Sequence, residues 1–133
     1  MDFARLHARS DGLQVFIDCR TSPSRSESVI ELPEGADMAA FQRYVHELEA
    51  LHGWLDADLV RNGFLMGEEV GELLGAMRKA QRHLERGTPT GDLPTEVVDH
   101  VGEEIVDVLN YLLAIANRLD IDVETAFRKK NAR

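Results

Sequence analysis

Two acidic runs, Glu68-Glu69-Val70-Gly71-Glu72 and Glu103-Glu104-Ile105-Val106-Asp107, lie inside long apolar segments and decide the fold. Each run holds two carboxylates three residues apart, Glu69 with Glu72 and Glu104 with Asp107. Residues three apart in an α-helix project from one face, so each run places a carboxylate pair on one helix. Two unit charges about 4 Å apart repel by about 4 kcal/mol at an effective dielectric near 20. A hard divalent cation removes that repulsion because it prefers oxygen ligands, and the pattern therefore predicts a metal site.

The segments around the two runs also read as helices. Apolar residues recur at helical spacing over 38–51, with Asp37 as the expected N-cap and Gly53 as the expected end. We expect three further helices, at about 56–84, at about 96–119 with Thr95 as its cap, and from Asp122 onward.

A loop separates the two acidic helices. The stretch Arg86–Pro94 has two prolines and two glycines and cannot continue a helix. A short connection makes its two helices antiparallel neighbours, so the expected fold class is an all-α helical bundle. The segment 106–116 is apolar on nearly all sides, which favours a central bundle helix or a subunit interface, and we expect an oligomer.

Each long helix has one apolar face that we expect to be buried. On a helical wheel these faces contain Leu59, Met66, Val70, Leu73, Met77 and Leu84, and Val98, Val101, Ile105, Val108, Leu112 and Leu119. The carboxylates lie at the shoulder of each face, beside Leu65 and Ala76 on one helix and His100 and Tyr111 on the other. We expect the two shoulders to face each other.

The N-terminal part has a different pattern. Leu13–Asp18 and Val29–Leu32 are short runs rich in β-branched residues, with a turn-forming stretch between them. They predict a β-hairpin appendage over residues 1–36, ahead of a helical domain over residues 37–133.

Composition excludes several classes of function. A formal net charge of −9 argues against nucleic-acid binding, which needs clustered Lys and Arg. No stretch approaches the roughly 18 apolar residues of a membrane span, and the first residues lack an apolar signal core. The single cysteine, Cys19, cannot form an internal disulfide, which agrees with a reducing compartment. We therefore expect a cytoplasmic protein with no membrane contact.

The order of the two runs resembles a known signature. Glu68-Glu69-x-x-Glu72 followed, after a loop, by Glu104-x-x-Asp107 is similar to the motifs of the MazG-like all-α nucleoside triphosphate pyrophosphohydrolases, which include dimeric dUTPases and dCTP pyrophosphatases. The resemblance covers roughly residues 41–133. It implies a homodimer or homotetramer that uses Mg²⁺, with Mn²⁺ as a substitute, to cut a nucleoside triphosphate between the α- and β-phosphates. The expected substrates are deoxynucleoside or non-canonical triphosphates, as for a house-cleaning enzyme.

The resemblance also assigns roles to single residues. It makes Glu69, Glu72, Glu104 and Asp107 metal ligands, and Glu68 a catalytic residue that holds a further metal ion or assists the attacking water. It makes Trp54, Asn62 and Tyr111 candidates for base and sugar recognition, and Lys130, Asn131 and Arg133 candidates for phosphate contact. Lone aromatic residues more often fill cores, and a basic helix end is as often simply solvated.

Three other interpretations remain. Acidic runs are commonly solvated helix faces without a ligand. A di-iron carboxylate bundle needs Glu-x-x-His pairs, and neither run has a His at that spacing. The non-enzymatic alternative is an acidic helical interaction module that binds a basic partner.

Overall fold

The protein is described by a computed structural model, which places residues 30–132. This part of the chain forms the helices α1 (Met38–His52), α2 (Leu59–Glu85), α3 (Thr95–Arg118) and α4 (Val123–Asn131), and it contains no strand. A short 3₁₀ turn, Thr90–Asp92, lies in the loop between α2 and α3. The all-α prediction is confirmed.

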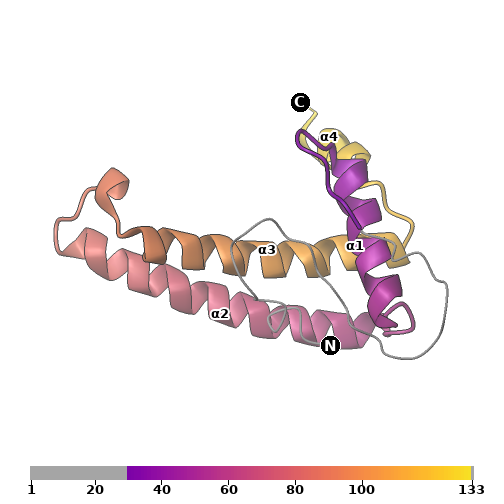
Figure 1. Ribbon diagram of the computed structural model, residues 1–133, viewed down its shortest axis with the longest axis horizontal. Helices are drawn as coiled ribbons and strands as arrows, with labels where there is room; N and C mark the ends of the chain where they lie inside the picture. The colour runs from indigo at the N-terminus through magenta and orange to yellow at the C-terminus, as the bar shows by residue number, and fades with distance from the viewer. Residues whose placement is uncertain (1–29, 133) are drawn as a thin grey trace, which may run out of the picture.

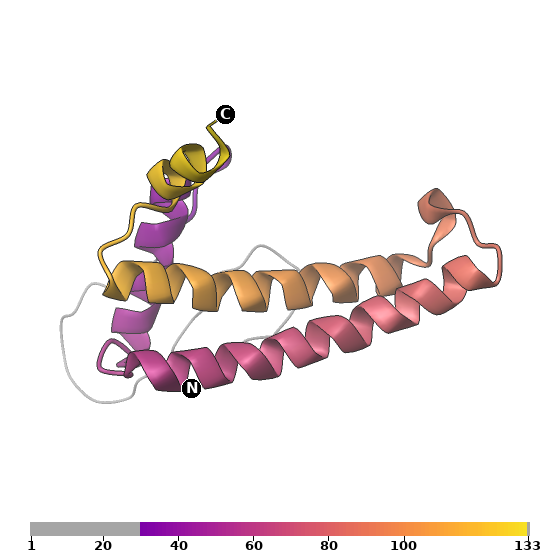
Figure 2. The ribbon, with the colours of Figure 1, turned by 180° about the vertical axis from the view of Figure 1, so that it is seen from behind.

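The helices are arranged as a long hairpin with a cross-piece. Figures 1 and 2 show α2 and α3 running antiparallel along the length of the molecule, with their connecting loop at one end. At the opposite end α1 packs on α3, and α4 packs mainly on α1. Within the described chain, other helices therefore cover the α2–α3 hairpin only at this end, and only on one side.

Aspartate side chains start three of the helices. The Oδ1 atoms of Asp37, Asp58 and Asp122 accept hydrogen bonds of 2.6–2.8 Å from the amides of Ala40, Arg61 and Thr125. The backbone and side-chain hydrogen bonds from Thr125 hold the pKa of the Asp122 carboxyl below its ordinary value. The predicted caps at Asp37 and Asp122 are confirmed, and the cap at Asp58 starts α2 slightly later than predicted.

Gly53 ends α1 as predicted. Its φ of 69° lies in the left-handed region that favours glycine, and its amide donates to carbonyl oxygens of the last turn. The predicted cap at Thr95 is wrong, because Thr95 is already the first residue of α3. Pro94 occupies the cap position, where its carbonyl accepts from the amides of Val97 and Val98.

The two predicted shoulders do face each other. The buried residues of α2 are Asn62, Glu69 and Ala76, spaced seven apart on the stripe that packs against α3. The buried residues of α3 include Glu104, Asp107, Tyr111 and Ala114, which follow the facing stripe. The carboxylates thus lie in the contact between the two long helices.

The prediction that the apolar faces are buried is wrong within the described residues 30–132. Val70 and Met77 on α2 are 37% and 50% exposed, and Ile105 and Leu112 on α3, with Leu119 directly after it, are 47–51% exposed. We call these five residues the apolar flank. The two long helices α2 and α3 pack mainly on each other, and the stripes that hold the carboxylates form this contact. The apolar face of each helix therefore lies beside the contact and not within it. On both helices the apolar face lies about 100° around the helix axis from the contact stripe, in the same direction along the sequence. Because the two helices are antiparallel, both apolar faces then lie on the same side of the hairpin.

A small core and a buried ion pair hold α1 to the hairpin. Val45, Leu113 and Ala114 form the buried cluster, with Phe41 and Tyr44 packed against it. Next to it, Nη2 of Arg118 lies 2.8 Å from Oε1 of Glu49, whose side chain is 1% exposed. Arg118 also donates to the carbonyl oxygens of Trp54, Ala57 and Ala114, so one side chain joins α3 to the α1–α2 connection.

Glycine occurs at every fourth position of α2 from residue 63 to 75. A Cβ atom added at Gly63, Gly67, Gly71 or Gly75 would meet no side chain or other segment of the described chain within 4 Å. These glycines are therefore not required by close packing within residues 30–132.

The predicted N-terminal hairpin lies largely outside the described residues. The run Leu13–Asp18 falls entirely outside them, and residues 30–32 of the second run have no strand conformation. Across residues 30–132, no helix combines the length and apolar character required to span a bilayer.

Candidate metal centre

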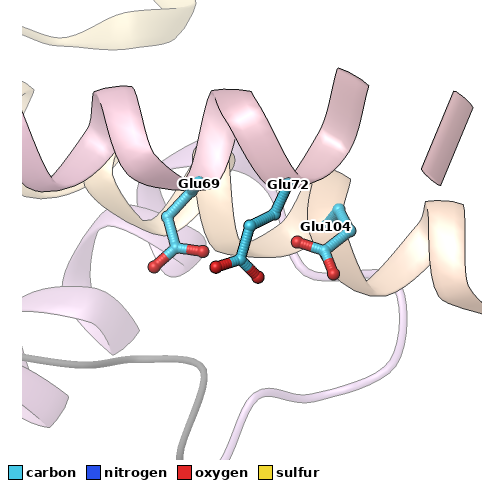
Figure 3. A group of neighbouring side chains, drawn as sticks. All are labelled: Glu69, Glu72 and Glu104. Carbon is cyan, nitrogen blue, oxygen red and sulfur yellow. The ribbon is translucent and has the colours of Figure 1, made fainter. Parts of the chain in front are cut away.

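Three carboxylates come together midway along the hairpin. One oxygen each of Glu69 and Glu72 on α2 and of Glu104 on α3 lie within 4.8 Å of one another. Figure 3 shows the three side chains projecting to the same side of the two helices. Glu69 and Glu104 are each 6% exposed, whereas Glu72 is exposed. The group therefore has a buried floor on both helices and one carboxylate open to solvent.

The donor set and its spacing suit a small divalent cation. Carboxylate oxygens are the ligands that Mg²⁺ prefers, and two ligands on opposite sides of Mg²⁺ at 2.0–2.1 Å are ~4.2 Å apart. Oxygens within 4.8 Å of one another are close enough to share one ion after the side chains adjust. Without a cation, two charged carboxylates at that distance repel by roughly 3 kcal/mol at an effective dielectric of 20. The residues present therefore fit an oxygen-bound metal ion.

Two more predicted residues lie beside this group. Asp107 is 5% exposed and stands one turn beyond Glu104 on α3, but it is not among the three residues whose oxygens converge. Glu68 precedes Glu69 on α2 and is exposed. The structure thus brings together three of the four predicted ligands and places the fourth one turn away.

The three residues predicted to contact the base and sugar lie in different surroundings. Tyr111 is 1% exposed and follows Asp107 by one turn, on the stripe of α3 that faces α2. Trp54 lies in the α1–α2 connection, where its ring stacks on His52 with centroids 4.5 Å apart. Asn62 is fully buried, and with its amide oxygen toward Arg118 it accepts from Nε at 3.1 Å and Nη1 at 3.0 Å. In this conformation Asn62 supports the ion pair and does not reach the surface.

The basic end of the chain is far from the carboxylates. Lys130 and Asn131 are exposed at the end of α4, where Nδ2 of Asn131 donates to the Phe127 carbonyl. At 1.5 Å per residue, Glu104 lies about 21 Å from the end of α3, and α4 packs on α1 beyond that end. The same copy of the chain does not bring Lys130 to the carboxylate group, and Arg133 lies outside the described residues.

Sequence reasoning missed two contacts of the carboxylate group. Nδ1 of His100 lies 3.4 Å from Oε1 of Glu104 and 3.9 Å from Oε2 of Glu103. On the other side of the ring, Nε2 lies 3.5 Å from Nζ of Lys79 on α2. The four-residue spacing of His100 and Glu104 was visible in the sequence. The contact with Lys79 depends on the register of the two helices, which the sequence does not state.

Comparisons with models of protein families, with curated proteins and with solved structures gave no match. The resemblance to the MazG-like enzymes therefore rests on the residues of the two acidic runs.

Proposed function

We propose that the protein is a Mg²⁺-dependent nucleoside triphosphate pyrophosphohydrolase. Water adds across the anhydride between the α- and β-phosphates, so that a nucleoside monophosphate and pyrophosphate are released. The observation that carries the proposal is the convergence of Glu69, Glu72 and Glu104 from two helices, in the motif order of the MazG-like enzymes. Deoxynucleoside or non-canonical triphosphates are the substrates that the resemblance favours, and Mn²⁺ is expected to substitute for Mg²⁺.

The roles of the residues follow from their burial. A bound Mg²⁺ polarises the phosphate oxygens and lowers the pKa of bound water. Glu69 and Glu104, which are buried in the helix contact, would hold the cation. Glu72, which is exposed, leaves the outer side of the centre open to phosphate and water. Glu68 is on the solvent side of the same helix, where it can accept a proton from the attacking water.

We expect a pyrophosphate-release screen to identify at least one substrate. The screen covers canonical and modified nucleoside triphosphates, with Mg²⁺, Mn²⁺ or EDTA, and separates pyrophosphate from orthophosphate. Release of pyrophosphate that requires the metal supports the proposal. Stepwise release of orthophosphate would place the cleavage elsewhere. Absence of any hydrolysis, together with binding of a basic partner that survives Glu72→Gln, would favour the acidic interaction module instead.

We propose further that a second copy of the chain covers the apolar flank. Ile105, Leu112 and Leu119 recur every seven residues along α3 and its C-cap, as do Val70 and Met77 on α2, and this spacing is typical of helices that pack side by side. The flank contains no charged residue, so the matching partner is a second apolar helical pair. The same flank on another copy supplies one, and a two-fold axis lets the contact close on itself.

The double variant Ile105→Asp/Leu112→Asp is expected to convert the oligomer into monomers, because it places charges at the centre of the contact. Light scattering coupled to gel filtration gives the mass of each species. Thr95→Asp, which adds a charge at an exposed position on the same helix, is the control and should leave the mass unchanged. A wild-type protein that is monomeric at micromolar concentration would contradict the proposal.

A further inference from the structure

His100 connects a buried ligand of the proposed metal centre to a lysine on the facing helix. Its Nδ1 atom lies 3.4 Å from the Glu104 carboxylate, and its Nε2 atom lies 3.5 Å from Nζ of Lys79. Glu103, at 3.9 Å from Nδ1, is the more distant carboxylate of the pair. The side chains of Lys79, His100 and Glu104 thus form a line of contacts that runs from α2 to α3.

The chemistry of lysine fixes the state of the histidine ring. An ammonium group only donates hydrogen bonds, so Nε2 of His100 must be the acceptor in its contact with Lys79. A neutral ring that accepts at Nε2 bears its proton at Nδ1, and that proton faces the carboxylates. In this arrangement Lys79 donates to Nε2 of His100, and Nδ1 of His100 faces the Glu104 carboxylate at 3.4 Å.

The side chains of Glu104 and His100 differ in burial. The Glu104 side chain is 8% exposed, whereas that of His100 is 39% exposed, so the histidine lies between a buried carboxylate and solvent. The distance of 3.4 Å between Nδ1 and Oε1 is long for a hydrogen bond but within the range of an ion pair. Groups that hydrogen-bond to metal-ligating carboxylates fix the direction in which the ligand atom points.

We propose that His100 is a positioning residue for the metal centre, and that Lys79 holds His100 in the tautomer that donates to Glu104. This inference rests on the proposed function, because it assigns a role within the same centre. His100, next to Oε1 of Glu104, would fix the direction in which this carboxylate points toward the proposed cation. Neither His100 nor Lys79 touches the ion.

The test measures Mn²⁺ binding by the electron paramagnetic resonance signal of the free ion, with Mg²⁺ as competitor. His100→Ala is expected to weaken the affinity by about 10-fold or more, the usual range for residues that support metal ligands. His100→Asn should remain close to wild type, because its amide nitrogen stands near the position of Nδ1. His100→Gln should resemble His100→Ala, since its amide nitrogen stands near Nε2 instead. Lys79→Met should produce a smaller loss, because the ring is then able to adopt the other tautomer.

The variants separate positioning from simple packing. Glutamine fills more of the histidine's volume than asparagine, so a purely structural role predicts that His100→Gln is the milder change. His46→Ala, at an exposed histidine on α1, is the matched control and should bind Mn²⁺ like wild type. Circular dichroism of the metal-free proteins checks that the helices are retained, and Lys79→Met tests the same line at an exposed residue if His100→Ala does not fold.

Wild-type affinity in His100→Ala would overturn the inference, as would an equal loss in His100→Asn and His100→Ala. Wild-type affinity in Lys79→Met would overturn the role of the lysine. Failure of the proposed metal centre looks different: wild type and Glu72→Gln would then bind Mn²⁺ equally weakly. Binding that Glu72→Gln weakens and the His100 variants do not would leave the centre in place and remove only the positioning role.

Discussion

Replacing Glu104 with glutamine is expected to lower the rate of pyrophosphate release by at least about 100-fold. The change keeps the shape of the side chain and removes the charge of a proposed metal ligand that is 6% exposed. A catalytic metal ion contributes several kcal/mol to the transition state. Losing about 3 kcal/mol of that contribution corresponds to a rate loss of about 100-fold, since 1.36 kcal/mol is tenfold. Glu69→Gln and Glu72→Gln should have similar effects, measured at saturating Mg²⁺.

The matched control is Glu47→Gln, which neutralises an exposed glutamate on α1 and should retain full activity. Asp107→Asn asks a separate question, because Asp107 lies one turn from the converging oxygens. A loss equal to that of Glu104→Gln would mean that Asp107 joins the centre when the ion binds. Near-normal rates in two of the three converging glutamates would remove the proposed site.

Arg118→Met is expected to destabilise the protein by about 3–5 kcal/mol, the usual cost of leaving one charge of a buried ion pair without its partner. Glu49 is 1% exposed, and Arg118 is the cation that contacts it. The substitution also removes the donor to the backbone carbonyls of Trp54, Ala57 and Ala114. Urea unfolding in metal-free buffer, followed by circular dichroism, measures the change in the free energy of unfolding.

An exposed ion pair in the same chain is the control for this measurement. Arg128 contacts Glu124 on α4, with side chains 76% and 46% exposed, and Arg128→Met should cost no more than about 1 kcal/mol. The double variant Glu49→Leu/Arg118→Met should recover part of the loss, because neither charge is then left buried alone. Equal effects of Arg118→Met and Arg128→Met would mean that the buried pair contributes no more than a surface pair.

The helices and their ends were largely predictable because their signals are local. Asp37 and Asp122 each cap a helix with their own side chains, and Gly53 ends α1 through its own backbone conformation. The same holds for the carboxylates, since residues three apart share a helix face wherever the helix packs. Thr95 was misassigned because Thr is a common cap, while the carbonyl of Pro94 determined where α3 begins.

Which face of each helix is covered was not predictable in the same way. Apolar periodicity shows which face prefers burial, but it does not show whether the covering partner is in the same chain. Val70 and Ile105 belong to faces that the described chain leaves open, while Glu69 and Glu104 lie in the contact. The pairing of Glu49 with Arg118, 69 residues apart, likewise depends on how α1 meets α3.

The glycines of α2 have a consequence for how the carboxylates of the proposed metal centre come together. Each glycine inside a helix costs about 0.5–1 kcal/mol relative to alanine, so the four at positions 63, 67, 71 and 75 weaken α2 by roughly 2–4 kcal/mol. A segment with that deficit is a poor helix in isolation and depends on its contact with α3. Glu69 and Glu72 therefore acquire their helical spacing only when α2 packs on α3. An ion that requires both helices binds the folded hairpin and not the unfolded chain, so ion binding and the coil-to-helix transition of α2 are thermodynamically linked.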